Sequence, residues 1–322
     1  MPATVTLADG VMTFQAGPGE ANRVFVIRAD DGMHLVDTAV AVTAGGGCTQ
    51  ENASEAFCAS DDLTLLEIDV VAGDEGDYVD LRPAGAFLAS KLDGGDGDDT
   101  LLGGFAFAGN VLDGGVGADT FGGDWGGTVD YSDRTNPVTV TIGDEVANDG
   151  EAGEGDFVST GIDQVYGGHA ADTITAMNVQ DAGRTYLRGG EGNDHLSALP
   201  VGWTSIVEGG PGDDVLHVAG PDSTIFARSG DDILSGAHGG QALRGENGKD
   251  TLRGLAGNDL LSGGADADHL NGGPAKDQVF GNSGNDTFMA RDGKPDSLDG
   301  GGGTDKARVD AIDHLARIEQ TF

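Results

Sequence analysis

The chain has 322 residues, of which 58 are glycine and only 6% are aromatic. Glycine is far above its usual share of about 7%, and so few large side chains argue for the thin core of a solenoid rather than a conventional two-layer core. The 55 acidic and 17 basic residues give a formal net charge of −38, which argues against nucleic acid and anionic membranes as partners. No run of 18 apolar residues is present, so we predict no membrane span.

The first 71 residues alternate between short strand-like runs and turns. We predict strands at residues 11–15, 23–28, 33–37 and 63–71. The first coil of a solenoid needs a cover, because its open edge would otherwise pair with other chains. We therefore assign residues 1–71 as an N-terminal β cap. No signal peptide precedes the first strand-like residues, which we interpret as a trimmed N-terminus.

Two cysteines, Cys48 and Cys58, lie in a short polar segment, which we expect to form a loop that projects from this cap. We favour a disulfide between them, formed in an oxidising compartment. The alternative is a pair of free thiols in a cytosolic protein. A zinc site is disfavoured, because no histidine or second cysteine pair lies nearby.

Residues 72–122 hold a first block of glycine–aspartate repeats. Residues 94–101 read GGDGDDTL, and residues 114–121 read GGVGADTF. A degenerate unit covers residues 73–79. The aspartates at the sixth position of these three units are Asp77, Asp99 and Asp119.

Residues 123–166 then interrupt the repeats. Residues 138–142 alternate with period two and predict a strand, while residues 143–156 are acidic and glycine-rich and predict a loop. We interpret the interruption as a strand-and-loop insert that enlarges one coil of the roll. The alternative is a small inserted domain.

The main array occupies residues 167–309 and repeats every nine residues, with Asp172 in its first unit. Glycine dominates the first and fourth positions and recurs at the second, and the eighth position is apolar throughout. Every second unit from Asp194 onward has aspartate at the sixth position, so two units make one coil of about 18 residues with an unbroken aspartate column on one edge. That column is Asp194, Asp214, Asp232, Asp250, Asp268, Asp286 and Asp305. The other edge has Ser223, Gln241, Asp259, Asp277 and Asp296.

This pattern has a direct chemical meaning. Glycine permits positive φ and close backbone approach, so the turns can be tight. Coils stacked about 4.8 Å apart bring equivalent turns into register. A cation between two turns would meet carbonyl and carboxylate oxygens from both, and such an all-oxygen shell suits Ca²⁺.

The tandem units resemble the RTX, or haemolysin-type, calcium-binding nonapeptide repeats, with consensus G-G-x-G-x-D-x-apolar-x. The resemblance implies a right-handed parallel β-roll of a secreted bacterial protein, with calcium between successive turns. Pro221 and Ala275 depart from the consensus at the fourth position. The side-chain ligands implied by the resemblance are Asp77, Asp99, Asp119, Asp172, Asp194, Asp214, Asp232, Asp250, Asp259, Asp268, Asp277, Asp286, Asp296 and Asp305.

Turn carbonyls complete the expected metal sites. They are those of Gly94, Gly114, Gly189, Gly209, Gly245, Gly254, Gly263, Gly272, Gly281 and Gly300. We expect roughly seven to ten calcium ions, with weak or absent sites at the Ser223 and Gln241 turns.

Residues 310–322 are expected to cap the C-terminal end. Ile312, Leu315 and Ile318 are spaced for one face of a short helix. A final pair of strands is the alternative.

No G-x-S-x-G, P-loop or H-E-x-x-H motif is present in the sequence. We therefore predict a non-enzymatic, secreted, calcium-dependent β-roll that folds on calcium and acts as a structural or adhesive module. We expect a monomer whose partner is a surface, a polysaccharide or the chain itself. The alternative is a calcium-dependent polysaccharide-active enzyme on a parallel β-helix. Its basic residues would come from Arg184, Arg188, Arg228, Arg244 and Arg253.

Overall fold

The computed structural model is all-β. The residues it describes are 2–29, 32–59, 66–106, 108–123, 126–177, 184–199 and 204–322. Within them the only helical element is one 3-10 turn, η2 (Arg82–Ala84), and no helix is long and apolar enough to cross a membrane. Parallel strands stack coil on coil, which confirms the predicted β-roll. The chain forms two compact units: the described residues of 1–131 and 142–164 belong to unit 1, and those of 132–141, 165–178 and 183–322 belong to unit 2.

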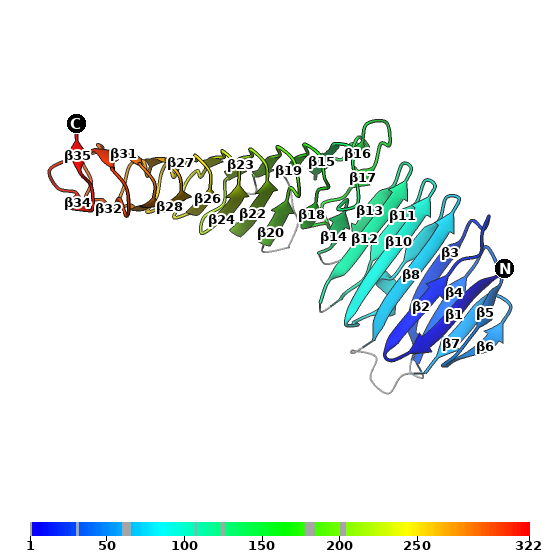
Figure 1. Ribbon diagram of the computed structural model, residues 1–322. Helices are drawn as coiled ribbons and strands as arrows, with labels where there is room; N and C mark the ends of the chain where they lie inside the picture. The colour runs from blue at the N-terminus through cyan, green and yellow to red at the C-terminus, as the bar shows by residue number, and fades with distance from the viewer. Residues whose placement is uncertain are drawn as a thin grey trace. The chain divides into compact units, whose positions relative to one another are not determined.

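In unit 1 the chain alternates between two sheets (Figure 1). The first sheet contains β1 (Ala3–Ala8), β2 (Val11–Gln15), β5 (Val42–Ala44), β8 (Glu67–Asp74), β10 (Ala89–Asp96), β12 (Asn110–Val116) and β14 (Thr128–Asp130). The second contains β3 (Arg23–Ala29), β4 (Gly32–Asp37), β6 (Cys48–Asn52), β7 (Glu55–Cys58), β9 (Tyr78–Asp80), β11 (Thr100–Gly103), β13 (Thr120–Gly123) and β17 (Phe157–Val158). The short β16 (Gly150–Glu151) also lies in this unit.

Unit 1 changes from antiparallel to parallel pairing along the chain. Strands β1 with β2, β3 with β4, β4 with β7 and β6 with β7 pair antiparallel, and from β8 onward each strand pairs in parallel with the next coil. The strands predicted at residues 11–15, 23–28 and 33–37 are confirmed as β2, β3 and β4. Of the strand predicted at residues 63–71, the part before residue 66 lies outside the described residues, and β8 begins at Glu67.

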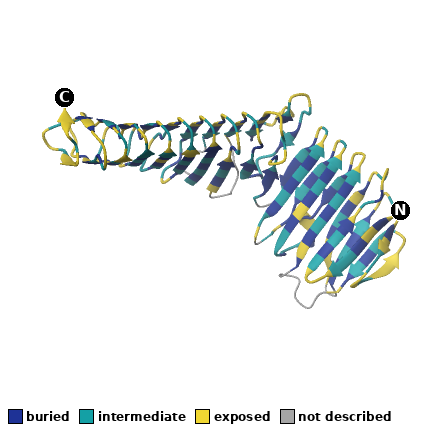
Figure 2. Cartoon of the chain, viewed as in Figure 1, coloured by how far each residue is buried: buried dark blue, intermediate teal, exposed yellow. Residues whose placement is uncertain are grey.

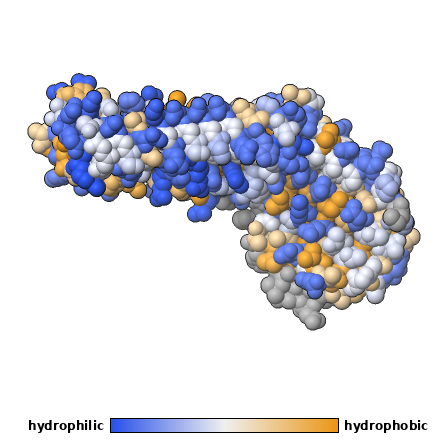
Figure 3. Space-filling view, in the orientation of Figure 1, coloured by the Kyte–Doolittle hydropathy of each residue, from blue (hydrophilic) through white to orange (hydrophobic). Residues whose placement is uncertain are grey.

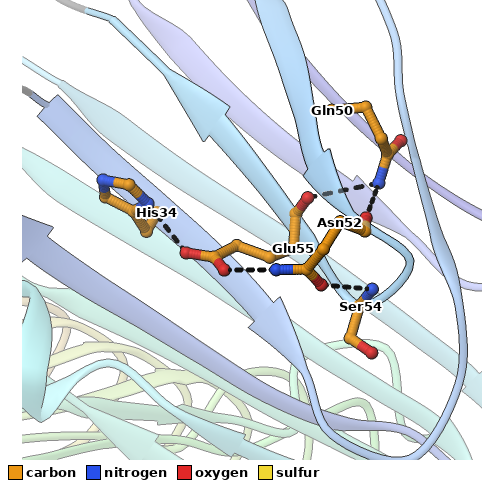
Figure 4. A network of polar contacts seen from close by, with 5 residues as sticks. All are labelled: His34, Gln50, Asn52, Ser54 and Glu55. Carbon is orange, nitrogen blue, oxygen red and sulfur yellow. Dashed lines mark hydrogen bonds and ion pairs between the residues drawn. The ribbon is translucent and has the colours of Figure 1, made fainter.

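The predicted disulfide is present and joins Cys48 to Cys58. The two cysteines face each other across the antiparallel strands β6 and β7, rather than lying in an irregular loop. Polar side chains add to this link: Glu55 Oε1 lies 2.9 Å from His34 Nδ1 on β4, and its Oε2 accepts a hydrogen bond of 2.7 Å from Asn52 Nδ2 (Figure 4). The β6–β7 hairpin is therefore fixed both covalently and by hydrogen bonds.

In unit 2 two rows of short strands are connected by tight turns (Figure 1). One sheet contains β18 (Gln164–Tyr166), β20 (Arg184–Arg188), β22 (Thr204–Pro211), β24 (Thr224–Ser229), β26 (Ala242–Asn247), β28 (Leu260–Ala265), β30 (Gln278–Ser283), β32 (Ser297–Asp299) and β34 (His314–Ala316). The other contains β15 (Val138–Ile142), β19 (Thr173–Ala176), β21 (His195–Ala198), β23 (Val215–Val218), β25 (Ile233–Ser235), β27 (Thr251–Arg253), β29 (His269–Asn271), β31 (Thr287–Met289), β33 (Lys306–Arg308) and β35 (Gln320–Thr321). Strand β15 confirms the strand predicted at residues 138–142.

The core of unit 2 consists of columns of single apolar residues. Equivalent positions of successive coils stay in register, so that Leu234 lies opposite Leu216 and Leu252 in the neighbouring coils. Buried positions alternate with more exposed ones along the strands (Figure 2), and the visible face of this unit is largely hydrophilic (Figure 3). The columns are Leu187, Val207, Ile225, Leu243, Leu261, Val279 and Leu298 in one sheet, and Leu196, Leu216, Leu234, Leu252, Leu270, Phe288 and Ala307 in the other.

The last coil differs from the others. Residues 310–322 form β34 and β35 rather than the predicted short helix, so the alternative of two strands is correct. Leu315 lies opposite Leu298 and extends its core column. It is 42% exposed because no further described coil covers it.

Candidate metal sites in the turns

The turns of the roll are tight because successive coils approach each other through glycine. Gly210 and Gly212 have φ of +138° and +141°, a region that side chains of L residues rarely adopt. A Cβ on Gly212 would lie 1.7 Å from the carbonyl oxygen of Gly192 in the preceding coil. At Gly210 and Gly212 glycine is therefore required both by backbone conformation and by space, whereas Arg228 and Glu246 adopt positive φ at the second position of other units.

An unbroken chain of hydrogen bonds links the aspartates of one edge of unit 2. Oδ1 of each aspartate accepts a bond from the backbone N–H of the equivalent residue one coil earlier, as from Asp194 to Asp214 at 2.8 Å and from Asp214 to Asp232 at 2.7 Å. The series runs from Asp172 to Asp305. At its end Glu319 Oε2 accepts from the N–H of Asp305 at 2.8 Å.

Unit 1 contains a shorter column of the same kind. Asp99 Oδ1 accepts from the N–H of Asp77, and Asp119 Oδ1 from the N–H of Asp99. The next acceptor is Asp156 Oδ1, 2.9 Å from the N–H of Asp119. Tyr131 donates its hydroxyl hydrogen to Asp156 Oδ2 at 2.8 Å. Sequence reasoning missed Asp156 because it lies in the acidic loop and not in a recognisable unit.

The other edge of unit 2 changes chemistry along its length. Asp259, Asp277 and Asp296 each accept the N–H of the preceding coil, and Asp313 Oδ1 completes the series by accepting from Asp296. Asp313, like Glu319, was missed because no nine-residue unit surrounds it.

At two earlier turns of this edge a neutral side chain takes the place of aspartate. Ser223 Oγ accepts from the N–H of Ser205 at 2.9 Å. Gln241 donates from Nε2 to the carbonyl oxygens of Gly220 and His238, at 3.2 and 3.0 Å. The glutamine amide therefore donates hydrogen bonds to two backbone carbonyl oxygens that would otherwise need another positive partner.

The second carboxylate oxygen of most column aspartates is buried and, among the described residues, has no hydrogen-bond partner. These oxygens are Oδ2 of Asp77, Asp99, Asp194, Asp214, Asp232, Asp250, Asp259, Asp268, Asp277, Asp286 and Asp305. A buried anionic oxygen without a partner is costly. A cation is the partner that this repeated arrangement lacks.

Burial without a neighbouring positive charge raises the pKa values of these aspartates. Desolvation raises the pKa of Asp214 and of Asp268 to about 8. It likewise raises the pKa of Asp99, Asp194 and Asp232 to about 7. The carboxylates are therefore held in an environment that favours either a proton or a cation.

Carbonyl oxygens converge on the same points as the carboxylates. A Cβ on Gly254 would lie 2.4 Å from Asp259 Oδ2 and 2.6 Å from the carbonyl oxygen of Gly272, one coil later. The carbonyls that converge in this way with a carboxylate are those of Gly114, Gly189, Gly263, Gly272 and Gly300, whereas the carbonyl of Gly254 lies beside the Gln241 amide oxygen. The Cα atoms of Gly94, Gly245 and Gly281 lie next to points where a carboxylate and a carbonyl oxygen meet. The carbonyl of Gly209 accepts a hydrogen bond of 3.1 Å from the N–H of Gly190.

The donor set fits a hard cation. Within the described residues no three His, Cys, Asp or Glu side chains are grouped closely enough to hold a metal by themselves. Each aspartate turn instead offers one carboxylate together with backbone carbonyls, which are calcium ligands rather than zinc ligands. Both oxygen types come from successive coils, so one ion would join two coils.

Comparison with known proteins agrees with this chemistry. The family model of the RTX calcium-binding nonapeptide repeat (4 copies) matches residues 89–106, 157–178, 179–199, 208–239 and 244–279. No curated protein matches the chain. The matched segments include the turns of Asp99, Asp172, Asp194, Asp214 and Asp259. These segments of the chain are therefore similar to RTX calcium-binding nonapeptide repeats.

Proposed function

We propose that this chain is a secreted module that folds when calcium binds between its coils and that serves a structural or adhesive role. The observation that carries the proposal is the repeated burial of carboxylate oxygens that have no hydrogen-bond partner among the described residues. Calcium would neutralise these oxygens and tie adjacent coils together. Because the unfolded chain lacks such sites, binding free energy becomes folding free energy.

The proposed ligands are the fourteen aspartates and the turn glycines named from the sequence. Asp156, Asp313 and Glu319 join them, because they accept the same inter-coil hydrogen bond. We expect roughly seven to ten ions. The Ser223 and Gln241 turns should bind calcium weakly or not at all.

An extracellular location is supported by two features. Extracellular calcium modules bind at about 10⁻⁴–10⁻³ M, so such a chain would stay loose in a cytosol and fold outside the cell. The Cys48–Cys58 disulfide requires an oxidising compartment. We also retain the proposed division into an N-terminal cap (1–71), a first repeat block (72–122), an insert (123–166), the main roll (167–309) and a C-terminal cap (310–322).

The decisive experiment is far-UV circular dichroism during a calcium titration from micromolar to about 10 mM. We expect a cooperative rise in β signal that a chelator reverses and that Mg²⁺ does not reproduce. Mg²⁺ is the matched control, because it demands a rigid octahedral shell. A chain that is equally folded in chelator and in calcium would contradict the proposal.

A further inference from the structure

We propose that one face of unit 2 binds a linear polysaccharide that carries carboxylate groups. The inference rests on the proposed function, because it names the partner class of the adhesive module. The face consists of outward-pointing side chains on β18, β20, β22, β24 and β26. We call it the arginine–aromatic face, and it comprises Tyr166, Arg184, Tyr186, Arg188, Glu208, Phe226, Arg228 and Arg244.

This face is unusual for the chain. Only 17 of the 322 residues are lysine or arginine and only 4 are tyrosine, yet four arginines and two tyrosines gather on these neighbouring strands. Along β20 the side chains of Arg184, Tyr186 and Arg188 alternate with the buried Thr185 and Leu187. The pleat of one strand thus presents two cations and an aromatic ring to the same side.

Strand register aligns part of the face into a row. Arg188 lies opposite Glu208, Glu208 opposite Phe226, and Phe226 opposite Arg244. Neighbouring strands are about 4.8 Å apart, so the row extends about 14 Å across the strands. An extended ligand chain could therefore lie across several coils and meet a charged or aromatic group at each one.

Several of these side chains are held in place by their neighbours. Tyr186 donates its hydroxyl hydrogen to Glu208 Oε2 at 2.6 Å, and Arg228 Nε lies 3.1 Å from Glu208 Oε1. The rings of Tyr166 and Tyr186 meet edge to face at 5.8 Å. The guanidinium groups of Arg228 and Arg244 lie 5.4 and 5.3 Å from the centre of the Phe226 ring. Such preorganisation lowers the entropy cost of binding.

Two of the cations are available for a ligand. Arg228 is ion-paired with Glu208 and with Glu246. Among the described residues, by contrast, neither Arg188 nor Arg244 has a carboxylate within ion-pair distance, and both are exposed. The arginine fork matches the two oxygens of a carboxylate.

A hollow adjoins the row and lies entirely within unit 2. Its volume is about 440 Å³, which is within the usual range for small-molecule sites of about 300–1,000 Å³. The side chains of Tyr166, His169, Arg188, Glu208 and Arg228 are part of its lining. It therefore combines an aromatic surface, cations and a hydrogen-bond acceptor.

These groups together select the ligand class. Aromatic rings pack against the C–H faces of sugar rings, and Glu208 can accept hydrogen bonds from hydroxyl groups. A neutral sugar would leave Arg188 and Arg244 without a carboxylate at ion-pair distance, whereas different uronic acids of one chain could supply a carboxylate to each.

The test is isothermal titration calorimetry of the full chain in saturating calcium with tetragalacturonate, an oligomer too short to form a calcium gel. Neutral tetragalactose and tetraglutamate are the comparison ligands. We expect binding of tetragalacturonate only, weakened at least tenfold by Arg188→Ala combined with Arg244→Ala. Arg253→Ala on β27 of the other sheet is the matched control and should leave the affinity unchanged.

Circular dichroism of the same samples reports folding separately. A folded chain that fails to bind tetragalacturonate would overturn this inference and leave the calcium proposal intact. Equal binding of tetragalactose would overturn the requirement for carboxylates. Equal binding of tetraglutamate would assign the face to acidic protein segments, and unchanged affinity in the double variant would place the ligand elsewhere.

Discussion

The two rows of turns in unit 2 hold their coils together by different means. One row has aspartate in every coil from Asp172 to Asp305, whereas the other has Ser223 and Gln241 before its aspartates begin at Asp259. At Ser223 and at the aspartate turns the side chain supplies an oxygen for the N–H of the preceding coil, whereas Gln241 Oε1 accepts from the N–H of Ala237 in its own turn. Only the aspartates also bury a negative charge, so only they require a cation.

Gln241 shows what replaces the cation. Its amide donates to the Gly220 and His238 carbonyls within the turn region, and it adds no charge. A turn of this roll therefore needs a positive partner for its carbonyl oxygens. Calcium beside a carboxylate can be that partner, and so can a single neutral amide such as that of Gln241.

The largest expected effect is that of pH on the calcium-free chain. Burial raises the pKa of Asp214 and Asp268 to about 8, above the ordinary value of 3.8. Because the folded-state pKa exceeds the unfolded one, these groups stabilise the fold fully below pH 3.8 and lose that contribution as pH rises through about 8. In chelator, circular dichroism should show more β structure at pH 5 than at pH 8.5. Saturating calcium should abolish this difference, and stability that rises with pH in chelator would contradict the scheme.

A smaller effect is expected from substitutions of Asp232 in the middle of the aspartate row. Asp232→Ala leaves the N–H of Asp214 without its acceptor, which costs about 1–3 kcal/mol, and it also removes calcium ligands. Asp232→Asn keeps the acceptor oxygen and adds an amide like that of Gln241. In urea unfolding with calcium, the free energy of unfolding should be highest for the wild type, lower for Asp232→Asn and lowest for Asp232→Ala. In chelator, Asp232→Asn should be at least as stable as the wild type.

The matched control for these variants is Ser223→Ala in the other row. It removes only the acceptor for the Ser205 N–H, a change of about 1 kcal/mol that should be the same with and without calcium. Equal stability of Asp232→Asn and Asp232→Ala in chelator would show that the inter-coil acceptor is not what holds this turn.

An effect smaller than that of Asp232→Ala, which also loses calcium ligands, is expected from Gln241→Asp, which makes the two rows alike. Asp259 already accepts the N–H of residue 241, so the new carboxylate should complete a site with the neighbouring turns. We expect one or two additional ions per chain by equilibrium dialysis and atomic emission. The variant should also lose about 1–3 kcal/mol of stability in chelator. An unchanged ion count would mean that this turn lacks the carbonyl arrangement that binding requires.

The repeat made much of the fold predictable. A fixed apolar position such as Leu234, flanked by glycine turns, dictates parallel stacking with a coil of 18 residues, as the Asp214–Asp232 hydrogen bond confirms. The aspartates of both rows were identified for the same reason, since register brings repeat positions together.

The remainder was not predictable, because it lies outside the repeat. Asp156, Asp313 and Glu319 accept the N–H of the preceding coil. They lie in a loop and in the last coil, where the surrounding sequence does not follow the repeat. Any side chain that places an oxygen beside the exposed N–H can do so. The final strands β34 and β35 formed instead of a helix because pairing with the preceding coil outweighs the helical spacing of Ile312 and Leu315.

The pairing of each coil with the next also has a mechanical consequence. A pull on the C-terminal end loads the last coil alone, because each coil is bonded to its neighbours and to no distant part of the roll. Detaching one coil releases 18 residues, or about 60 Å of chain, before the next coil bears the load. If calcium binds between the coils as proposed, every release would also break the oxygen contacts around an ion shared with the neighbouring coil. The free calcium concentration would then set the force at which the roll begins to lengthen.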